Sequence, residues 1–210
     1  SNATTMIGAD VLNKTGYTGK GMKIAILDTG IVVDHPSFGA LSEDKLTETS
    51  LTKAGVNEIW DTLNASKTTS GNMSYYNSKL PFIFNYFTMS FDVSHATAQH
   101  DHGTHVAGIA AANKTDSNSV IGVAPDAQLV VMQVFSNNGG AGWDTIMAAL
   151  EDCVRLDVDS VNLSLGAAAG FTTSTDGMNE VLKQFVDTDI EVLIAAGNDT
   201  NNAYMNLTGL

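Results

Sequence analysis

The chain has 210 residues, of which 43% are hydrophobic and 16% are charged, so it is long enough for one globular domain with a sizeable buried core. Its 23 acidic and 10 basic residues give a formal net charge of -13, which argues against nucleic acid as a partner. No run approaches the roughly 18 apolar residues that a membrane span needs, and the single cysteine, Cys153, excludes an internal disulfide.

Short runs rich in Val, Ile and Leu alternate along the chain with amphipathic stretches. Each run is almost continuously apolar, which is typical of strands buried on both faces of a parallel sheet. The amphipathic stretches place apolar residues three and four positions apart, as helices do, and Asp144 and Asp176 lie near two expected helix starts. We predict strands at 22–27, 129–135, 159–165 and 190–196, and helices at 102–113, 143–156 and 175–186.

This alternation predicts an α/β fold, a doubly wound parallel sheet with right-handed crossovers and helices on both faces. Residues 38–100 interrupt the pattern with a long stretch rich in Ser, Thr and Asn. A short helix is expected near 56–64 and an aromatic, strand-like piece at 80–87. We interpret 38–100 as a surface excursion. Residues 1–3 resemble the remnant of a cleaved expression tag, so the domain is expected to occupy 4–210.

Three polar residues are expected at one edge of this sheet, because catalytic groups gather at the carboxyl ends of parallel strands. Asp28 ends the first strand in "AILDTG", and Asn198 follows the last strand in "IAAGN". His102 opens a helix of small residues in "HGTHVAG". Taken singly, Asp28 and Asn198 are also ordinary turn residues. Taken together, the three bring a carboxylate, an imidazole and an amide to one rim.

Five motifs in this sequence resemble those of the subtilisin-like serine peptidases, and they occur in that family's order. They are "AILDTGI", "HGTHVAGI", "GVAPDAQLVVMQVF", "VNLSLG" and "AAGN", and they cover nearly all of the chain outside 38–100. The segment "YYNSKLPFIFNY" is similar to the larger cell-envelope subtilases of Gram-positive bacteria. The resemblance implies a serine-type endopeptidase that acts on polypeptides at an extracellular or cell-envelope location.

The resemblance also implies roles for individual residues. His102 would be the general base, Asp28 would hold its other ring nitrogen, and Asn198 would donate to the oxyanion of the tetrahedral intermediate. Extended substrate would pair as a β-strand between two segments of small residues. These segments are Gly139, Gly140 and Ala141 on one side and Ser164, Leu165 and Gly166 on the other, with Ala195 and Ala196 in the first specificity pocket.

Metal ions are the alternative ligands of the histidine motif. His102 and His105 lie three positions apart, as zinc ligands can, but Gly and Thr occupy the two positions between them and the glutamate of an HExxH peptidase is absent. We expect His105 to donate to a neighbouring carbonyl. For calcium, the loop after the helix offers Asp116 and Asn118, yet Ser37 stands where several calcium-binding relatives carry an acid. Calcium is possible but not predicted, and no other metal or cofactor is expected.

The nucleophile is the main departure from the family pattern. In that family the serine follows the oxyanion asparagine by many residues, but no serine occurs in 199–210. Ser164 falls in the expected substrate segment and Ser174 in a polar loop. We therefore expect the N-terminal part of a peptidase domain, with a sheet incomplete at its C-terminal side and no activity alone. The missing part of the domain, or a second copy, would cover the exposed sheet edge.

Two other functions compete with the peptidase function. A non-catalytic, subtilase-derived binding or scaffolding module fits if the serine is absent from the complete protein. A nucleotide-binding doubly wound domain does not fit, because "DTGIVVD" after the first strand lacks the glycine-rich turn that binds phosphate.

Overall fold

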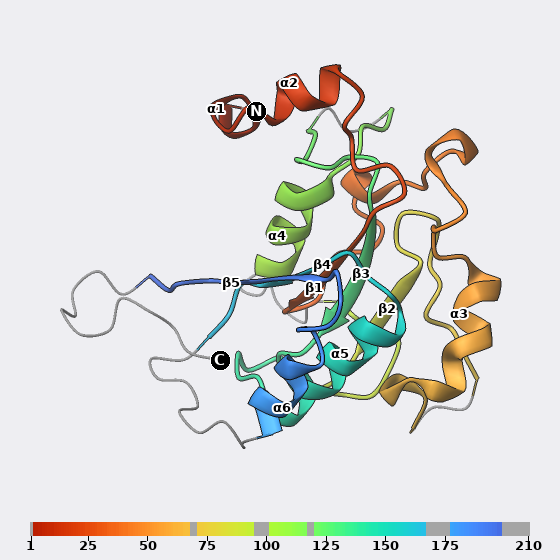
Figure 1. Cartoon of the computed structure of the whole chain (residues 1–210), viewed down its shortest axis with the longest axis vertical. Helices are drawn as coiled ribbons and strands as arrows, with labels where there is room; N and C mark the ends of the chain where they lie inside the picture. The colour runs from red at the N-terminus through yellow and green to blue at the C-terminus, as the bar shows by residue number, and fades with distance from the viewer. Residues whose placement is uncertain (1, 68–70, 95–100, 117–119, 167–176, 199–210) are drawn as a thin grey trace.

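Five parallel strands form one sheet in the computed structural model, which describes residues 2–67, 71–94, 101–116, 120–166 and 177–198 (Figure 1). Their order across the sheet is β2-β3-β1-β4-β5. The strands are β1 Lys23–Asp28, β2 Phe82–Asn85, β3 Gln128–Gln133, β4 Ser160–Leu163 and β5 Glu191–Ile194. The predicted α/β fold with a parallel sheet is confirmed, and four strands lie where the apolar runs predicted them.

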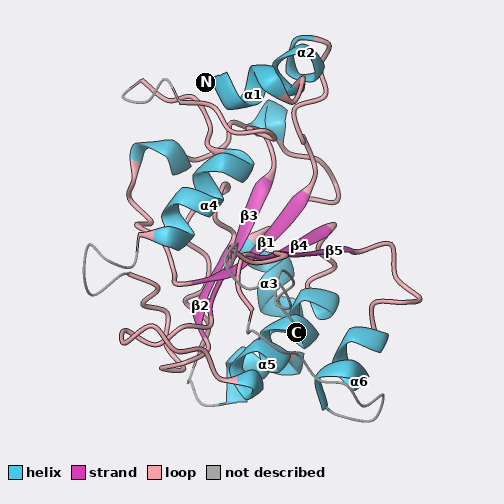
Figure 2. Cartoon of the chain, turned by 90° about the vertical axis from the view of Figure 1, so that its left-hand side faces the viewer, coloured by secondary structure: helices cyan, strands magenta, loops and turns pink. Residues whose placement is uncertain are grey.

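Helices cover both faces of the sheet, as Figures 1 and 2 show. On β1, Ile26 packs with the residues of α4, whereas Leu27 packs with those of α5 and α6. This alternation explains why the strand is apolar throughout, since successive side chains point to opposite faces. The helices are α1 Asn2–Met6, α2 Ala9–Lys14, α3 Lys53–Ile59, α4 His102–Ala111, α5 Trp143–Arg155 and α6 Gly177–Lys183. Asp144 lies in the first turn of α5, as predicted, and Asp176 lies outside the described residues.

Strand β2 corrects our interpretation of 38–100 as a surface excursion. All four of its residues are buried, and it pairs in parallel with β3. The rings of Phe84 and Tyr86 meet edge to face with their centroids 5.0 Å apart, and the Trp60 ring also meets Phe84 edge to face, at 6.3 Å. An aromatic run that is apolar on both faces gains more from burial in the sheet than from exposure at the surface. The helix expected near 56–64 is α3 with the turn that follows it.

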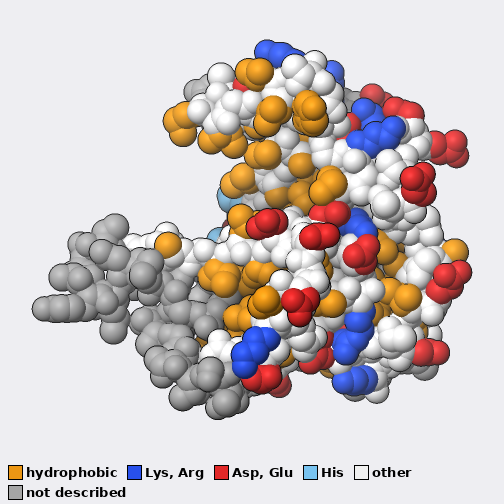
Figure 3. Space-filling model, viewed as in Figure 1, with side chains coloured by type: hydrophobic (Ala, Val, Ile, Leu, Met, Phe, Trp, Pro, Cys, Tyr) orange, Lys and Arg blue, Asp and Glu red, His pale blue; other side chains and the backbone are white. Residues whose placement is uncertain are grey.

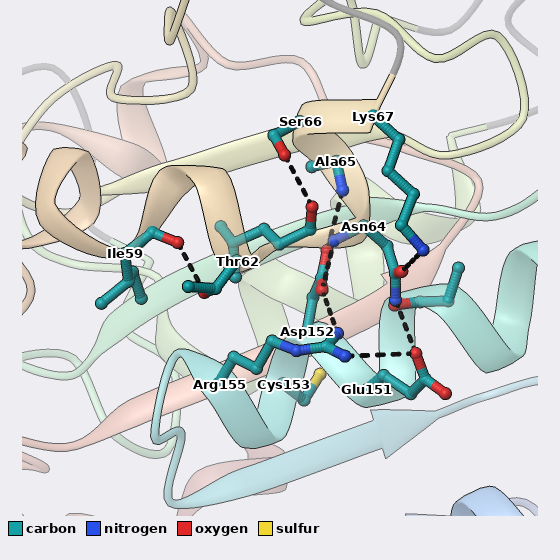
Figure 4. A network of polar contacts seen from close by, with 12 residues as sticks. Ile59, Thr62, Asn64, Ala65, Ser66, Lys67, Glu151, Asp152, Cys153 and Arg155 are labelled. Carbon is teal, nitrogen blue, oxygen red and sulfur yellow. Dashed lines mark hydrogen bonds and ion pairs between the residues drawn. The ribbon is translucent and has the colours of Figure 1, made fainter.

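A buried carboxylate fastens this part of the chain to α5 (Figure 4). Asp152 is fully buried, and its Oδ1 accepts hydrogen bonds from the Asn64 backbone N–H at 2.8 Å and from Arg155 at 2.8 Å. Its Oδ2 accepts from the Ala65 N–H at 3.0 Å and from the Tyr86 hydroxyl at 2.7 Å. Burial, together with the Asp152 charge, raises the pKa of Tyr86 well above its usual value. Asp152 thus accepts hydrogen bonds from three segments: the turn at Asn64, the end of β2 at Tyr86, and α5 itself.

We predict that Asp152→Ala lowers the free energy of unfolding by about 3 kcal/mol, because it leaves several buried donors unpaired. Its neighbour Glu151 provides the matched control. Glu151 is partly exposed; it pairs with Arg155 at 3.5 Å and accepts from the Asn64 side-chain amide at 2.8 Å, and that amide also donates to the Ala148 carbonyl. Glu151→Ala should therefore lose about 1 kcal/mol, clearly less than Asp152→Ala. Denaturant unfolding of both variants measures the difference, and equal losses would contradict the role given to Asp152.

A buried lysine holds the loop that precedes β3. The Lys79 ammonium donates to the carbonyls of Pro125 and Ala127, and the Leu129 N–H donates to the Lys79 carbonyl at 2.8 Å. Burial lowers the pKa of Lys79 to about 7, although the nearby Asp126 charge opposes this shift. Asp126 itself accepts from Lys45 at 2.9 Å. Lys45 and Lys79 therefore both bind the loop at 125–127, which precedes β3.

Lys79 should give the protein a stability that rises with pH. Its pKa is about 7 in the folded state and about 10.4 in an unfolded chain, so the unfolded state binds more protons between these values. The free energy of unfolding should increase from pH 7 toward pH 10, and Lys79→Met should remove that part of the slope. Lys45→Met is the control and should keep it, because the pKa of Lys45 is raised by Asp126. Identical slopes in wild type and Lys79→Met would refute the assignment.

Two apolar surfaces are exposed at the ends of the molecule. Leu193 and Ile194 on β5 are exposed, and this strand pairs only with β4 among the described strands. Apolar side chains also gather over α1 and α2 (Figure 3), with Met6 and Val11 among the most exposed. None of the described helices combines the length and the apolar character that crossing a membrane requires.

Candidate active site

The carboxyl end of β1 is the point where the chain's connections diverge, since β3 lies on one side of β1 and β4 on the other. Such a switch point is where α/β sheets bind ligands. Asp28 is the last residue of β1, and its side chain is 1% exposed. Ile26 is in register with Asn162 on β4, which is in register with Leu193 on β5. The segments that follow these strands therefore leave the sheet at the same edge as Asp28.

His102 and Asp28 form a hydrogen-bonded pair at this edge. Nδ1 of His102, the first residue of α4, lies 2.8 Å from Oδ1 and 3.0 Å from Oδ2 of Asp28. A carboxylate only accepts, so Nδ1 carries the proton and Nε2 of the neutral ring has a free lone pair. The Thr29 backbone N–H also donates to Asp28 Oδ1, at 2.7 Å. The imidazole is 55% exposed, so a buried anion orients it while its other nitrogen faces outward.

Two hydrogen bonds attach the start of α4 to the turn after β1. The Gly103 N–H donates to the Thr29 hydroxyl at 3.0 Å, and the Val32 N–H donates to the Thr104 hydroxyl at 3.0 Å. The Thr29 hydroxyl thus accepts from one of the backbone N–H groups at the helix start that have no partner within the helix. These contacts fix the direction in which α4 leaves the turn, and with it the position of His102.

Glycine is required at both sides of this contact. A Cβ on Gly103 would lie 2.1 Å from the Gly30 carbonyl oxygen. A Cβ on Gly30 would lie 2.2 Å from the Val93 carbonyl oxygen, and Gly30 has φ 92°, which other residues rarely adopt. The helix can therefore approach the turn closely enough for His102 to reach Asp28 only because Gly103 lacks a side chain, whereas Gly30 is needed for the backbone conformation of the turn and for its packing against Val93.

The two segments expected to bind substrate lie on either side of one pocket. Phe135 and Ala141 form an antiparallel bridge, and the Ser136 N–H donates to the Gly140 carbonyl at 2.8 Å, so the loop after β3 folds back as a short hairpin. The pocket has a volume of about 290 Å³. It is lined by Phe135, Gly139, Ala141, Trp143, Ile146, Leu165 and Gly166.

Some of the predicted residues lie outside this pocket. The Ser164 hydroxyl accepts from the Asn162 side chain at 2.8 Å. Ala195, Ala196 and Asn198 follow β5 at the same sheet edge and are exposed. The Ala195 N–H donates to the Leu163 carbonyl at 3.0 Å, and Asn198 makes no hydrogen bond with a described residue. Their roles in binding and catalysis stay predictions.

The apolar side of the pocket is not predicted from the sequence. Apolar spacing alone places Phe135 in a strand and Trp143 and Ile146 in a helix, and these residues also line the pocket. The sequence signal that could have found them is their position. The three residues flank the glycine-rich loop "NNGGAG", which follows a strand at the carboxyl edge of the sheet.

The metal alternatives find little support in the described residues. His105 is exposed and its ring makes no hydrogen bond with a described residue, so the expected donation to a carbonyl stays a prediction. Asp116 is exposed, Ser37 is buried, and Asn118 lies outside the described residues. Within the described ranges, no three His, Cys, Asp or Glu side chains are grouped as a metal site.

Comparison with known proteins gives the family. The family model described as the subtilase family matches residues 19–208. The chain belongs to this family. The family predicted from the five motifs is thereby confirmed, and the Asp28–His102 pair lies in two of those motifs.

Individual relatives of this subtilase show how it compares in length. It is 35% identical to the PI-type proteinase of Lactococcus lactis subsp. cremoris over 87% of this chain and 9% of that protein. It is 33% identical to the minor extracellular protease Vpr of Bacillus subtilis over 76% of this chain and 16% of that protein. It is 29% identical to an intracellular serine protease of Paenibacillus polymyxa over 86% of this chain and 43% of that protein. The chain thus spans less than half of each.

Two glycines of α4 provide a matched test of the close approach. Gly103→Ala should destabilise the protein by about 2 kcal/mol or more, because its Cβ would overlap the Gly30 carbonyl. Gly108→Ala has open space around its Cβ and should instead stabilise the helix by up to about 1 kcal/mol. Thermal unfolding measures both, and NMR resonances of the His102 ring should move only in Gly103→Ala. A tolerated Gly103→Ala would show that the contact is not tight.

Proposed function

We propose that this subtilase chain supplies the acid–base pair of a serine endopeptidase. The observation that carries the proposal is the His102 Nδ1–H bond to the buried Asp28, with Nε2 turned outward. In the reaction, Nε2 takes the proton of a serine hydroxyl as its oxygen attacks the peptide carbonyl carbon. The same proton then passes to the leaving amine. Asp28 stays ionised and stabilises the imidazolium formed in between.

The remaining predicted residues have roles in binding and charge stabilisation. The Asn198 side-chain amide donates to the oxyanion of the tetrahedral intermediate. Gly139, Gly140 and Ala141 form one wall for an extended peptide, and residues 164–166 form the other. The pocket between them, lined by Phe135, Trp143 and Leu165, supports a preference for substrates with an apolar side chain at that point. Ala195 and Ala196 contribute to the first specificity pocket.

No serine of the 210-residue chain is proposed as the nucleophile. In the described part of the chain no serine hydroxyl bonds to His102, and 199–210 contain no serine. The 210-residue chain by itself is therefore not expected to hydrolyse peptides. Further residues of its own domain would supply the hydroxyl, and these residues or a second copy would cover the exposed Leu193 and Ile194.

The proposed location is extracellular or at the cell envelope. The similarity to the lactococcal proteinase and to a protease named as extracellular supports it. A relative named as intracellular shows that family membership alone does not decide location. The formal charge of -13 fits a protein that works in an open or salty medium.

The alternative is a non-catalytic binding module that keeps the subtilase fold. The observation that favours it is the lack of a serine hydroxyl at His102 within the described residues. A serine-directed fluorophosphonate separates the two functions. It should label the complete native protein if that protein is a peptidase, and it should leave the 210-residue chain unlabelled.

Histidines on α4 allow a matched kinetic test in the complete native protein. With an unstructured protein as substrate, His102→Ala should lower kcat about 10⁴-fold through loss of the general base. Asn198→Ala should lower it about 100-fold or more through loss of the oxyanion donor. His105→Ala, on the same helix but exposed, should leave kcat unchanged. Activity that survives His102→Ala would remove this residue from the mechanism.

A further inference from the structure

One buried amide touches both halves of the candidate site. The structure assigns Gln133 as a positioning residue that couples the turn after Asp28 to the apolar substrate pocket. This inference rests on the proposed function for the meaning of the two halves. The contacts of Gln133 themselves are independent of it.

Gln133 lies at the carboxyl end of β3, directly beside the catalytic turn. It is the register partner of Asp28 and is 2% exposed. The Val134 N–H donates to the Asp28 carbonyl at 3.0 Å, and the Tyr86 N–H donates to the Gln133 carbonyl at 2.9 Å. Its backbone is therefore fixed from both neighbouring strands, which leaves the side chain in one place.

The side-chain nitrogen of Gln133 holds the pocket. Nε2 donates to the Phe135 carbonyl at 3.1 Å. Phe135 lines the pocket, and it also forms the bridge with Ala141 that closes the glycine-rich loop. This hydrogen bond therefore sets where the loop leaves the sheet.

The side-chain oxygen of Gln133 faces the turn. Oε1 is buried and has no N–H or O–H donor among the described residues. A Cβ on Gly30 would lie only 2.6 Å from it, so the Gly30 Cα is its close neighbour. The Val93 carbonyl oxygen, which accepts from the Ile31 N–H at 2.9 Å, lies on the same side of Gly30, 2.2 Å from the same Cβ position. Contacts of the Cα–H···O type are weak but directional.

This arrangement is unfavourable for stability alone. A buried amide oxygen without a strong donor costs about 1–3 kcal/mol, and an unbranched apolar side chain of similar volume would avoid that cost. Only an amide side chain can donate to the Phe135 carbonyl and, at the same time, place an oxygen against the turn at Gly30. Loss of the amide should therefore loosen His102 and the pocket together.

A second glutamine on the same strand is the natural control. Gln128 begins β3 and is 1% exposed. Its Oε1 accepts from the Leu51 N–H at 2.7 Å, and its Nε2 donates to the carbonyls of Leu51 and Ser78 at 2.9 Å each. It is fully satisfied and lies at the opposite end of the strand from Asp28.

The test compares Gln133→Met with Gln128→Met in the 210-residue chain at one fixed pH. The two measurements are the NMR resonances of the His102 ring and the affinity for the probe acetyl-Phe-Ala-Ala-Ala-amide, followed at the amides of Ile146 and Gly166. Gln133→Met should shift the ring resonances and weaken probe binding about fivefold, the equivalent of one hydrogen bond. Gln128→Met should lower stability and leave both measurements at the wild-type values.

Each outcome decides the inference. Unchanged values in Gln133→Met, or equal changes in both variants, would overturn it. If Gln133→Met does not fold, Gln133→Leu also removes the Nε2 donor without burying a carboxyl group and should weaken the probe in the same way. If the wild-type chain binds no probe, the substrate part of the proposed function fails. The His102 resonances then decide on their own whether Gln133 positions the turn.

Discussion

The close approach of α4 to the turn after β1 is the constraint on which the site depends. The start of α4 rests on this turn, with backbone against backbone, because Gly103 carries no side chain. From this contact follow the 2.8 Å bond between His102 and Asp28 and the exposure of the other ring nitrogen. The sheet supplies the other half of the constraint, since it holds Asp28 rigidly at its carboxyl edge.

Buried charge in this protein serves to join segments rather than to add stability. Asp152 gathers donors from α5, from the turn at Asn64 and from Tyr86, while Lys79 binds the two carbonyls before β3. Both groups are costly to bury, and both are compensated only when distant parts of the chain meet correctly. They fix the stretch between β1 and α4 against the sheet from opposite ends of β2.

The sequence predicted what local patterns encode. Continuous apolar runs located four strands, and the motifs around Asp28 and His102 located the pair that the structure brings together. The sequence did not predict that Phe82–Asn85 joins the sheet, because pairing between strands 48 positions apart leaves no periodic pattern in the sequence. Spacing alone does not give the side of a helix that faces solvent, and the structure leaves His105 exposed. The role proposed for Gln133 could not be predicted from the sequence, because its side-chain contacts with Gly30 and with the Phe135 carbonyl exist only in the folded sheet.

The acid and the base stand 74 positions apart in the chain, and β2 lies on the path between them. Closing a loop of that length costs conformational entropy, which the Asp28–His102 hydrogen bond alone could not offset. The hydrogen bond therefore requires that other contacts hold the chain between the two residues, such as the pairing of β2 with β3. The orientation of the imidazole is thus a property of the tertiary structure and not of the two residues by themselves.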